Sequence, residues 1–162
     1  MTISTPDLCD AHAEHVRVVT GLQWQHFGGV QAFGGPIDTV RCFEDNSVLK
    51  QQLFTPGEGK VLVVDGGGSL RHALIGDLIG AEAVKNGWAG VIIHGACRDV
   101  DELGQLDIGI LTLGAVPIKS VRRGEGQLNI PLRFGGVSFH PSDYVYADRN
   151  GMIVADQSLL DQ

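Results

Sequence analysis

Two kinds of hydrophobic periodicity meet in the middle of the chain. Residues 61–65 (VLVVD) form a short, β-branched apolar run followed by glycines, which is typical of a strand buried on both faces. Apolar residues then recur at helical spacing from Leu74 to Val84, and Asn86-Gly87 supplies a helix stop. Residues 89–94 make a second apolar run. This order of strand, helix and strand predicts a parallel β-α-β unit with a right-handed crossover.

Shorter elements are predicted on either side of this unit. Thr5-Pro6-Asp7 begins a short helix, and Asp45-Asn46-Ser47 begins another that runs to Leu53. A further turn of helix is expected over residues 101–106. The other apolar runs predict strands or buried segments, at residues 16–19, 30–32, 37–43, 110–118, 128–139, 144–147 and 152–155, with a hairpin turn at 148–151. The pattern indicates an α/β protein with a single domain over residues 1–162.

Side chains suited to chemistry collect at one end of the central unit. Asp77 lies at the start of the predicted helix, whereas Arg98 and Asp99 follow the second strand. A crossover helix runs back along the sheet, so that its N-terminus lies near the carboxyl ends of both strands, where open α/β sheets bind ligands. Ten helical residues descend about 15 Å and five strand residues climb about 16 Å. We therefore expect Asp77 to lie beside Arg98 and Asp99 in one pocket.

Two interpretations of the helix start stay open at this point. An acid at a helix N-terminus, such as Asp77, is often only a cap. In the functional alternative, the free backbone amides of Gly76, Asp77, Leu78 and Ile79 bind an anionic carboxylate, while the Asp77 side chain moves a proton through water.

The Arg98-Asp99 pair also has two interpretations. It is a solvent-exposed ion pair of little energetic value, or it is a working pair. In the second case Arg98 binds a substrate carboxylate or stabilises an enolate in bidentate fashion, and Asp99 holds a divalent cation. Because the region has carboxylates but no Cys/His cluster, the expected ion is hard, Mg²⁺ or Mn²⁺, and keeps several waters.

Other motifs are weaker. The glycines at 66–68 do not continue into GxGxxG, because residue 71 is arginine, and no GxxxxGK[ST] motif is present. Three cysteines without CxxC spacing predict neither a disulfide framework nor a thiolate zinc site, which fits a reducing compartment, and we expect a cytoplasmic protein.

Charge and hydropathy limit the partners. Nineteen acidic residues against twelve basic ones give a net charge of -7, which repels phosphates and argues against direct binding of nucleic acid. A basic protein partner stays open. The longest apolar passage, residues 108–118, is too short to span a bilayer, and no signal peptide is recognisable, so no membrane association is expected.

Several segments resemble those of a known family. They are residues 63–69 (VVDGGGS), 86–90 (NGWAG), 95–103 (GACRDVDEL) and 106–110 (LDIGI), with 8–10, 40–46 and 134–137 extending the match over nearly the whole chain. The chain resembles the regulator of ribonuclease activity A (RraA) family, which includes the class II 4-hydroxy-4-methyl-2-oxoglutarate aldolases. That resemblance implies a swivelling β/β/α domain assembled as a homotrimer, with sites between subunits.

The resemblance also implies roles for individual residues. The aldolases' motif of Asp, twenty residues and Arg-Asp falls on Asp77 and Arg98-Asp99. It implies substrate binding by residues 76–79 and Arg98, a metal ion on Asp99, and a carbon–carbon lyase that acts on a small 2-oxo acid and also decarboxylates oxaloacetate. The alternative is non-catalytic: like the family's namesake, the protein would bind and inhibit RNase E.

Overall fold

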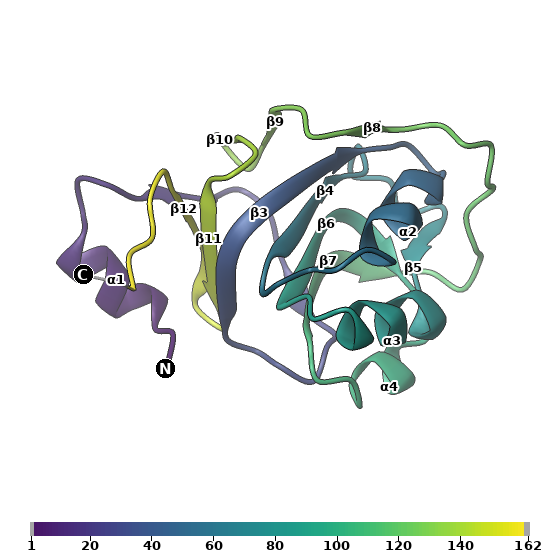
Figure 1. Cartoon of the computed structure of the whole chain (residues 1–162), viewed down its shortest axis with the longest axis horizontal. Coiled ribbons are helices and arrows are strands. Elements are labelled where there is room, and N and C mark those ends of the chain that lie inside the picture. Colours follow the sequence, from purple (N-terminus) through teal and green to yellow (C-terminus); the bar gives the residue numbers. More distant parts are fainter. Residues whose placement is uncertain (1, 161–162) are drawn as a thin grey trace.

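The computed structural model describes residues 2–160, in which a large mixed sheet carries three of the four helices on one side (Figure 1). The helices are α1 (Thr5–Ala11), α2 (Ser47–Leu53), α3 (Asp77–Lys85) and α4 (Val100–Leu103). The strands are β1 (Arg17–Val18), β2 (Gln25–His26), β3 (Phe33–Arg41), β4 (Val61–Asp65), β5 (Ala73–Ile75), β6 (Gly90–Cys97), β7 (Gly109–Ala115), β8 (Gln127–Leu128), β9 (Leu132–Phe134), β10 (Val137–Phe139), β11 (Tyr144–Asp148) and β12 (Gly151–Ala155).

The sheet has the order β1-β12-β11-β3-β4-β6-β7-β2, with β5 paired to β6 and β8 paired to β3. Its centre is parallel, because β3, β4, β6 and β7 all run in one direction, while β11, β12 and β1 add antiparallel strands on one side and β2 on the other. Strands β4 and β6 pair from Val61↔Gly90 to Asp65↔His94. The predicted α/β class and the parallel β-α-β unit are therefore confirmed.

Burial on both faces of the sheet explains why residues 61–64 of β4 are all apolar. Leu62 and Val64 belong to the core under α2 and α3, whereas Val61 and Val63 belong to a second core formed with β9 to β12. Successive side chains of a strand point to opposite faces, so a strand covered on both sides needs an unbroken apolar run.

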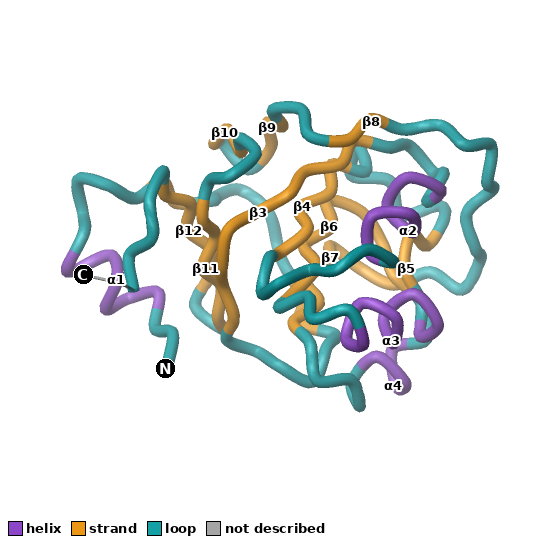
Figure 2. The backbone as a smooth tube through the Cα atoms, in the orientation of Figure 1, coloured by secondary structure: helices purple, strands orange, loops and turns teal. Residues whose placement is uncertain are grey.

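Strand β3 joins the two halves of the sheet. Its first part, Phe33 to Pro36, pairs with β11, and its second part, Ile37 to Arg41, pairs with β4. In Figure 2 this strand is the long curved segment between the two groups of strands. Pro36, which has no N–H to donate, lies at the point of transfer.

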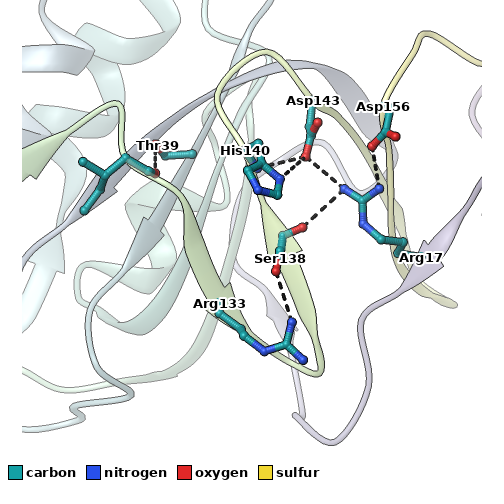
Figure 3. Close-up of polar contacts among 8 residues, drawn as sticks. Arg17, Thr39, Arg133, Ser138, His140, Asp143 and Asp156 are labelled. Atoms are coloured by element: carbon teal, nitrogen blue, oxygen red, sulfur yellow. Dashed lines mark hydrogen bonds and ion pairs between the residues drawn. The ribbon is translucent and has the colours of Figure 1, made fainter.

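An ion-pair network connects β1 and the segment after β12 to this framework (Figure 3). Arg17 on β1 donates to Asp156 Oδ1 at 2.6 Å and to Asp143 Oδ2 at 2.9 Å, and it also reaches the Ser138 carbonyl at 3.3 Å. Asp143 Oδ2 further accepts the His140 backbone N–H at 2.9 Å. The network thus links β1, β10 with the segment that follows it, and the segment that follows β12.

Several predicted boundaries were wrong. The helical spacing places Leu74 and Ile75 in the central helix, but they lie in β5, and α3 begins only at Asp77, because both side chains are buried beside β6. The strand at 30–32 is only an isolated bridge at Val30, and the strand at 37–43 instead begins at Phe33 and ends at Arg41.

The predicted segment 128–139 is likewise divided into β8 and the β9–β10 hairpin, whose turn is Gly135-Gly136. Strand β2 gave no sequence signal because it has only two residues. Over the described residues, no helix has both the length and the apolar character needed to cross a bilayer.

Close packing at the start of β7 gives a stability prediction. A Cβ on Gly109 would lie 2.1 Å from the Phe33 ring, within the second core. Gly109→Ala is expected to lower the free energy of unfolding by about 1–3 kcal/mol, because the ring has no room to move without disturbing its neighbours. Urea unfolding measures this loss.

The matched control is Gly104→Ala at the end of α4, where the new Cβ would lie 3.5 Å from the nearest atoms and φ is -64°. We expect a change within about 0.5 kcal/mol there. Equal stabilities of the Gly109→Ala variant and the parent would contradict the packing described for Phe33.

Candidate active site

A pocket of about 80 Å³ lies where β5, β6 and α3 meet. Gly76 connects β5 to α3 in an extended conformation (φ -138°, ψ -165°), so that Asp77 is the first helical residue. Strand β6 ends at Cys97, and Arg98 and Asp99 follow it directly. The pocket is lined by residues of these elements and of two other segments: Asn46, Ala73, Ile75, Gly76, Asp77, Leu78, Ile79, Arg98, Asp99, Lys119, Ser120 and Arg122.

The predicted meeting of Asp77 with Arg98-Asp99 is confirmed as geometry. Asp99 Oδ2 accepts the Asp77 backbone N–H at 3.0 Å, across 22 residues of sequence. Asp99 itself lies in the left-handed region (φ 59°, ψ 48°), which asparagine and aspartate tolerate better than other residues. Asp99 therefore caps α3 from outside the helix.

Two consequences follow for the sequence interpretations. The Asp77 amide is bonded to Asp99, so it is not free as the sequence interpretation assumed, while substrate binding by Asp77 stays a prediction. For Leu78, whose side chain is 79% exposed, and for Ile79, substrate binding stays a prediction. Arg98 donates to the Pro117 carbonyl at 3.4 Å, so Arg98 and Asp99 have separate partners and do not form the simple ion pair considered above.

Gly76 has a steric role that the sequence did not reveal. A Cβ at this position would lie 2.5 Å from Asp99 Oδ2 and 3.4 Å from Arg98 Cγ. Any larger residue would therefore displace the Asp99 carboxylate, although the backbone angles of Gly76 suit other residues. Glycine at 76 makes room for the two side chains that follow β6.

The two carboxylates affect each other. The pKa of Asp77 is raised above its ordinary value, chiefly by the hydrogen bond between its side chain and that of Asp99, with desolvation and the negative charge of Asp99 adding to the shift. A carboxylate held next to another one binds a proton more readily, so Asp77 is suited to accept a proton.

Basic side chains form one wall of the pocket, and sequence reasoning missed them. Lys119 and Arg122 join Arg98 there, and Arg122 Nε donates to Asn46 Oδ1 at 3.0 Å. The available signal was the basic run Lys119-Ser120-Val121-Arg122-Arg123 in a chain of net charge -7. Its connection to the site could not be inferred because it lies in a loop about twenty residues beyond Asp99.

The donor set fits a hard cation with few protein ligands. Within residues 2–160, no three His, Cys, Asp or Glu side chains come together to hold an ion. Asp99 and its neighbour Asp77 supply oxygen donors only. Mg²⁺ is commonly bound by one or two carboxylates while waters and substrate oxygens complete its shell, so the residues present are compatible with it.

The two buried cysteines are not nucleophiles. Burial raises the pKa of Cys97 to about 11 and that of Cys42 to about 12, and both are free thiols. At neutral pH both remain protonated, and the thiolate is the reactive form. Cys97 is a packing residue, since its side chain is fully buried.

Comparison with known proteins now adds to this geometry. The model of the RraA-like family, described as Aldolase/RraA, matches residues 5–154. The chain belongs to the RraA-like family. Its predicted resemblance and its fold class are thereby confirmed.

Individual RraA-like relatives share one name. A protein of Alcanivorax borkumensis is 67% identical over 160 residues, covering 99% of this chain and 100% of its own length, and a Pseudomonas aeruginosa protein is 54% identical over 155 residues, covering 96% and 95%. Both are named "Putative 4-hydroxy-4-methyl-2-oxoglutarate aldolase".

Two solved structures are also similar, and their names differ from that one. The RNA-processing inhibitor RraA from Thermus thermophilis has a TM-score of 0.92 at 41% identity, covering 97% of this chain and 94% of that one. A Geobacillus kaustophilus protein, named S-adenosylmethionine: 2-dimethylmenaquinone methyltransferase, has a TM-score of 0.96 at 46% identity, with 99% coverage of both chains.

Proposed function

We propose that this protein is a divalent-metal-dependent aldolase that cleaves 4-hydroxy-4-methyl-2-oxoglutarate into two molecules of pyruvate. The observation that carries the proposal is the contact of Asp77 with Asp99 beside Arg98, in a pocket with a basic wall. The names of the Alcanivorax and Pseudomonas relatives support it.

Each side chain of the pocket has a role in this reaction. Asp99 would hold Mg²⁺ or Mn²⁺, which supplies Lewis-acid polarisation of the 2-oxo acid. Asp77 takes the proton of the substrate's 4-hydroxyl through a water molecule. The C3–C4 bond then breaks, which releases one pyruvate and leaves the enolate of a second, and the Arg98 guanidinium stabilises the charge on that enolate. The enolate takes up a proton at C3 from water to give the second pyruvate.

The same site accounts for a secondary activity. Loss of CO₂ from oxaloacetate gives the same pyruvate enolate, so we infer that the protein also decarboxylates oxaloacetate. Both substrates carry a second carboxylate, and Lys119 and Arg122 are placed to attract it. A small dianionic 2-oxo acid is therefore the substrate class that fits this pocket.

We infer further that the protein acts as a homotrimer in the cytoplasm, with each site at a subunit boundary. Apolar side chains are exposed near the pocket, among them Leu78 (79%), Ile118 (53%) and Val121 (49%), which supports coverage by another subunit. Three free cysteines fit a reducing compartment.

The decisive experiment is pyruvate release measured with a coupled lactate dehydrogenase assay. We expect release from 4-hydroxy-4-methyl-2-oxoglutarate and from oxaloacetate to require Mg²⁺ or Mn²⁺, to stop with chelator, and to fall by about 10²–10³-fold in Asp99→Asn and Arg98→Ala. Asparagine is chosen at 99 because it retains an oxygen for the Asp77 N–H and tolerates the left-handed conformation. Parent rates in Asp99→Asn would exclude the proposed enzyme.

A second candidate function is regulation of RNA turnover by binding RNase E. The Thermus RraA structure and the net charge of -7 favour it, because an acidic surface suits a basic, disordered protein tail. Inhibition of RNase E by this protein that survives Asp99→Asn would support this role independently of catalysis.

A further inference from the structure

The loop that carries Lys119 and Arg122 has to be held in place by contacts with another part of the protein. It runs from the end of β7 to β8, and residues 121–126 in it are all exposed. In Figure 2 it is the long loop that passes outside α2 and β5 on its way to β8. An exposed loop without secondary structure does not by itself fix a side chain such as Arg122, since its backbone is free to adopt many conformations.

Asp45 supplies that support from the start of α2. Asp45 is buried, with only 3% of its surface exposed, and both oxygens of its carboxylate accept hydrogen bonds. Oδ1 accepts the Ser47 backbone N–H at 2.9 Å and the Ser47 hydroxyl at 2.6 Å. Oδ2 accepts the backbone N–H groups of Arg123 at 2.7 Å and Glu125 at 3.1 Å. The same carboxylate therefore joins the helix start to the loop.

Neighbours of Asp45 hold the same loop. The Val121 N–H donates to the Glu44 carbonyl at 3.2 Å, and the Gly124 N–H donates to the Ser47 hydroxyl at 3.1 Å. Asn46 Oδ1 accepts a hydrogen bond from Arg122 Nε at 3.0 Å. Because Asn46 engages Nε, a carboxylate would bind to the terminal nitrogens of this guanidinium.

We propose that Asp45 is a positioning residue for substrate binding, which acts by holding the loop so that Arg122 lies at the pocket. The proposal rests on the proposed function, since it assigns Arg122 to the second carboxylate of a dianionic 2-oxo acid. Asp45 lines no part of the pocket and acts on the substrate only through this loop.

Kinetics of Asp45→Asn test the proposal. Asparagine has the same shape, but it turns one oxygen into an NH₂ group, so the N–H groups of Arg123 and Glu125 lose a charged acceptor. We expect KM for 4-hydroxy-4-methyl-2-oxoglutarate to rise about tenfold while kcat stays within about twofold, because a group that binds ground and transition states equally affects KM alone.

A double-mutant cycle separates positioning from a direct role. If Asp45 acts through Arg122, Asp45→Asn will have no further effect on KM in an Arg122→Ala background. A rise in KM of the double variant equal to the product of the two single rises would overturn the proposal. So would a fall in kcat of Asp45→Asn at constant KM. Asp38→Asn is the matched control, because Asp38 also binds α2, by accepting a hydrogen bond from Gln52 Nε2 at 2.7 Å. We expect its KM and kcat to equal those of the parent.

Limited proteolysis reports on the loop without relying on activity. Trypsin cleaves after Arg122 and Arg123, and we expect this cleavage to be about tenfold faster in Asp45→Asn, while cleavage after Lys85 at the end of α3 is unchanged. Unchanged loop cleavage would overturn the positioning role even if the parent released no pyruvate, whereas an inactive parent with faster cleavage would reject only the proposed function.

Ser47→Ala, a milder variant, tests the same contacts if Asp45→Asn does not fold. Ser47→Ala removes the acceptor of the Gly124 N–H and one donor to Asp45. We expect the same changes in KM and in tryptic cleavage to a smaller extent, and no change in either quantity in this folded variant would count against the proposal.

Discussion

The Asp77→Asn variant is expected to release pyruvate about 10²–10⁴-fold more slowly than the parent, as is usual when a general base is removed. In metal-free buffer at about pH 7 the same variant should unfold about 1–3 °C above the parent, because it removes the repulsion between Asp77 and Asp99. Loss of activity with a gain of stability is unusual for a point mutation, since most substitutions destabilise.

The sign of the stability change follows from the raised pKa of Asp77. A carboxyl group whose pKa is higher in the folded state than in the unfolded state favours folding only while it is protonated, and this contribution is lost as pH rises through the folded pKa. The stability difference between variant and parent should therefore disappear near about pH 3, where both states are protonated.

Scanning calorimetry with chelator at both pH values measures this effect, and coupled pyruvate release measures the rate. A variant that retains the parent's rate would remove Asp77 from the mechanism. A variant that is less stable than the parent at neutral pH would contradict the repulsion within the Asp77–Asp99 pair.

Gly76→Ala is expected to lower pyruvate release by about 10²-fold, because displacement of a catalytic group by about 1 Å is enough for such a loss. The added Cβ would lie 2.5 Å from Asp99 Oδ2, so the carboxylate must turn away from the pocket and from the Asp77 N–H. Loss of that charged cap should also lower the free energy of unfolding by about 1–2 kcal/mol.

The control for this prediction is Gly104→Ala, which adds the same methyl group just beyond α4 without a close contact. It should retain the parent's rate. A crystal structure of Gly76→Ala with Asp99 in its original position, or an unchanged rate, would show that glycine at 76 is not required for steric reasons.

The sequence alone determined the central unit and which side chains meet at its edge. The apolar run of β4, the spacing along α3 and the run of β6 gave the β-α-β order, and simple lengths of helix and strand then brought Asp77 to Asp99. These features could be predicted because they depend on local periodicity and on the handedness of a crossover. The family resemblance had a different basis, the identity of motifs such as residues 63–69 and 95–103, with others spread over nearly the whole chain.

Tertiary structure decided how the pocket is completed. The contacts of Asn46 with Arg122 and of Asp45 with Arg123 join residues 76 and 78 positions apart, and they depend on side-chain hydrogen bonds that leave no periodic trace in the sequence. The steric role of Gly76 was hidden for a similar reason, because a missing Cβ matters only when another segment occupies its place. Periodicity thus located the acid and the Arg-Asp pair, whereas contacts between distant segments placed the basic wall beside them.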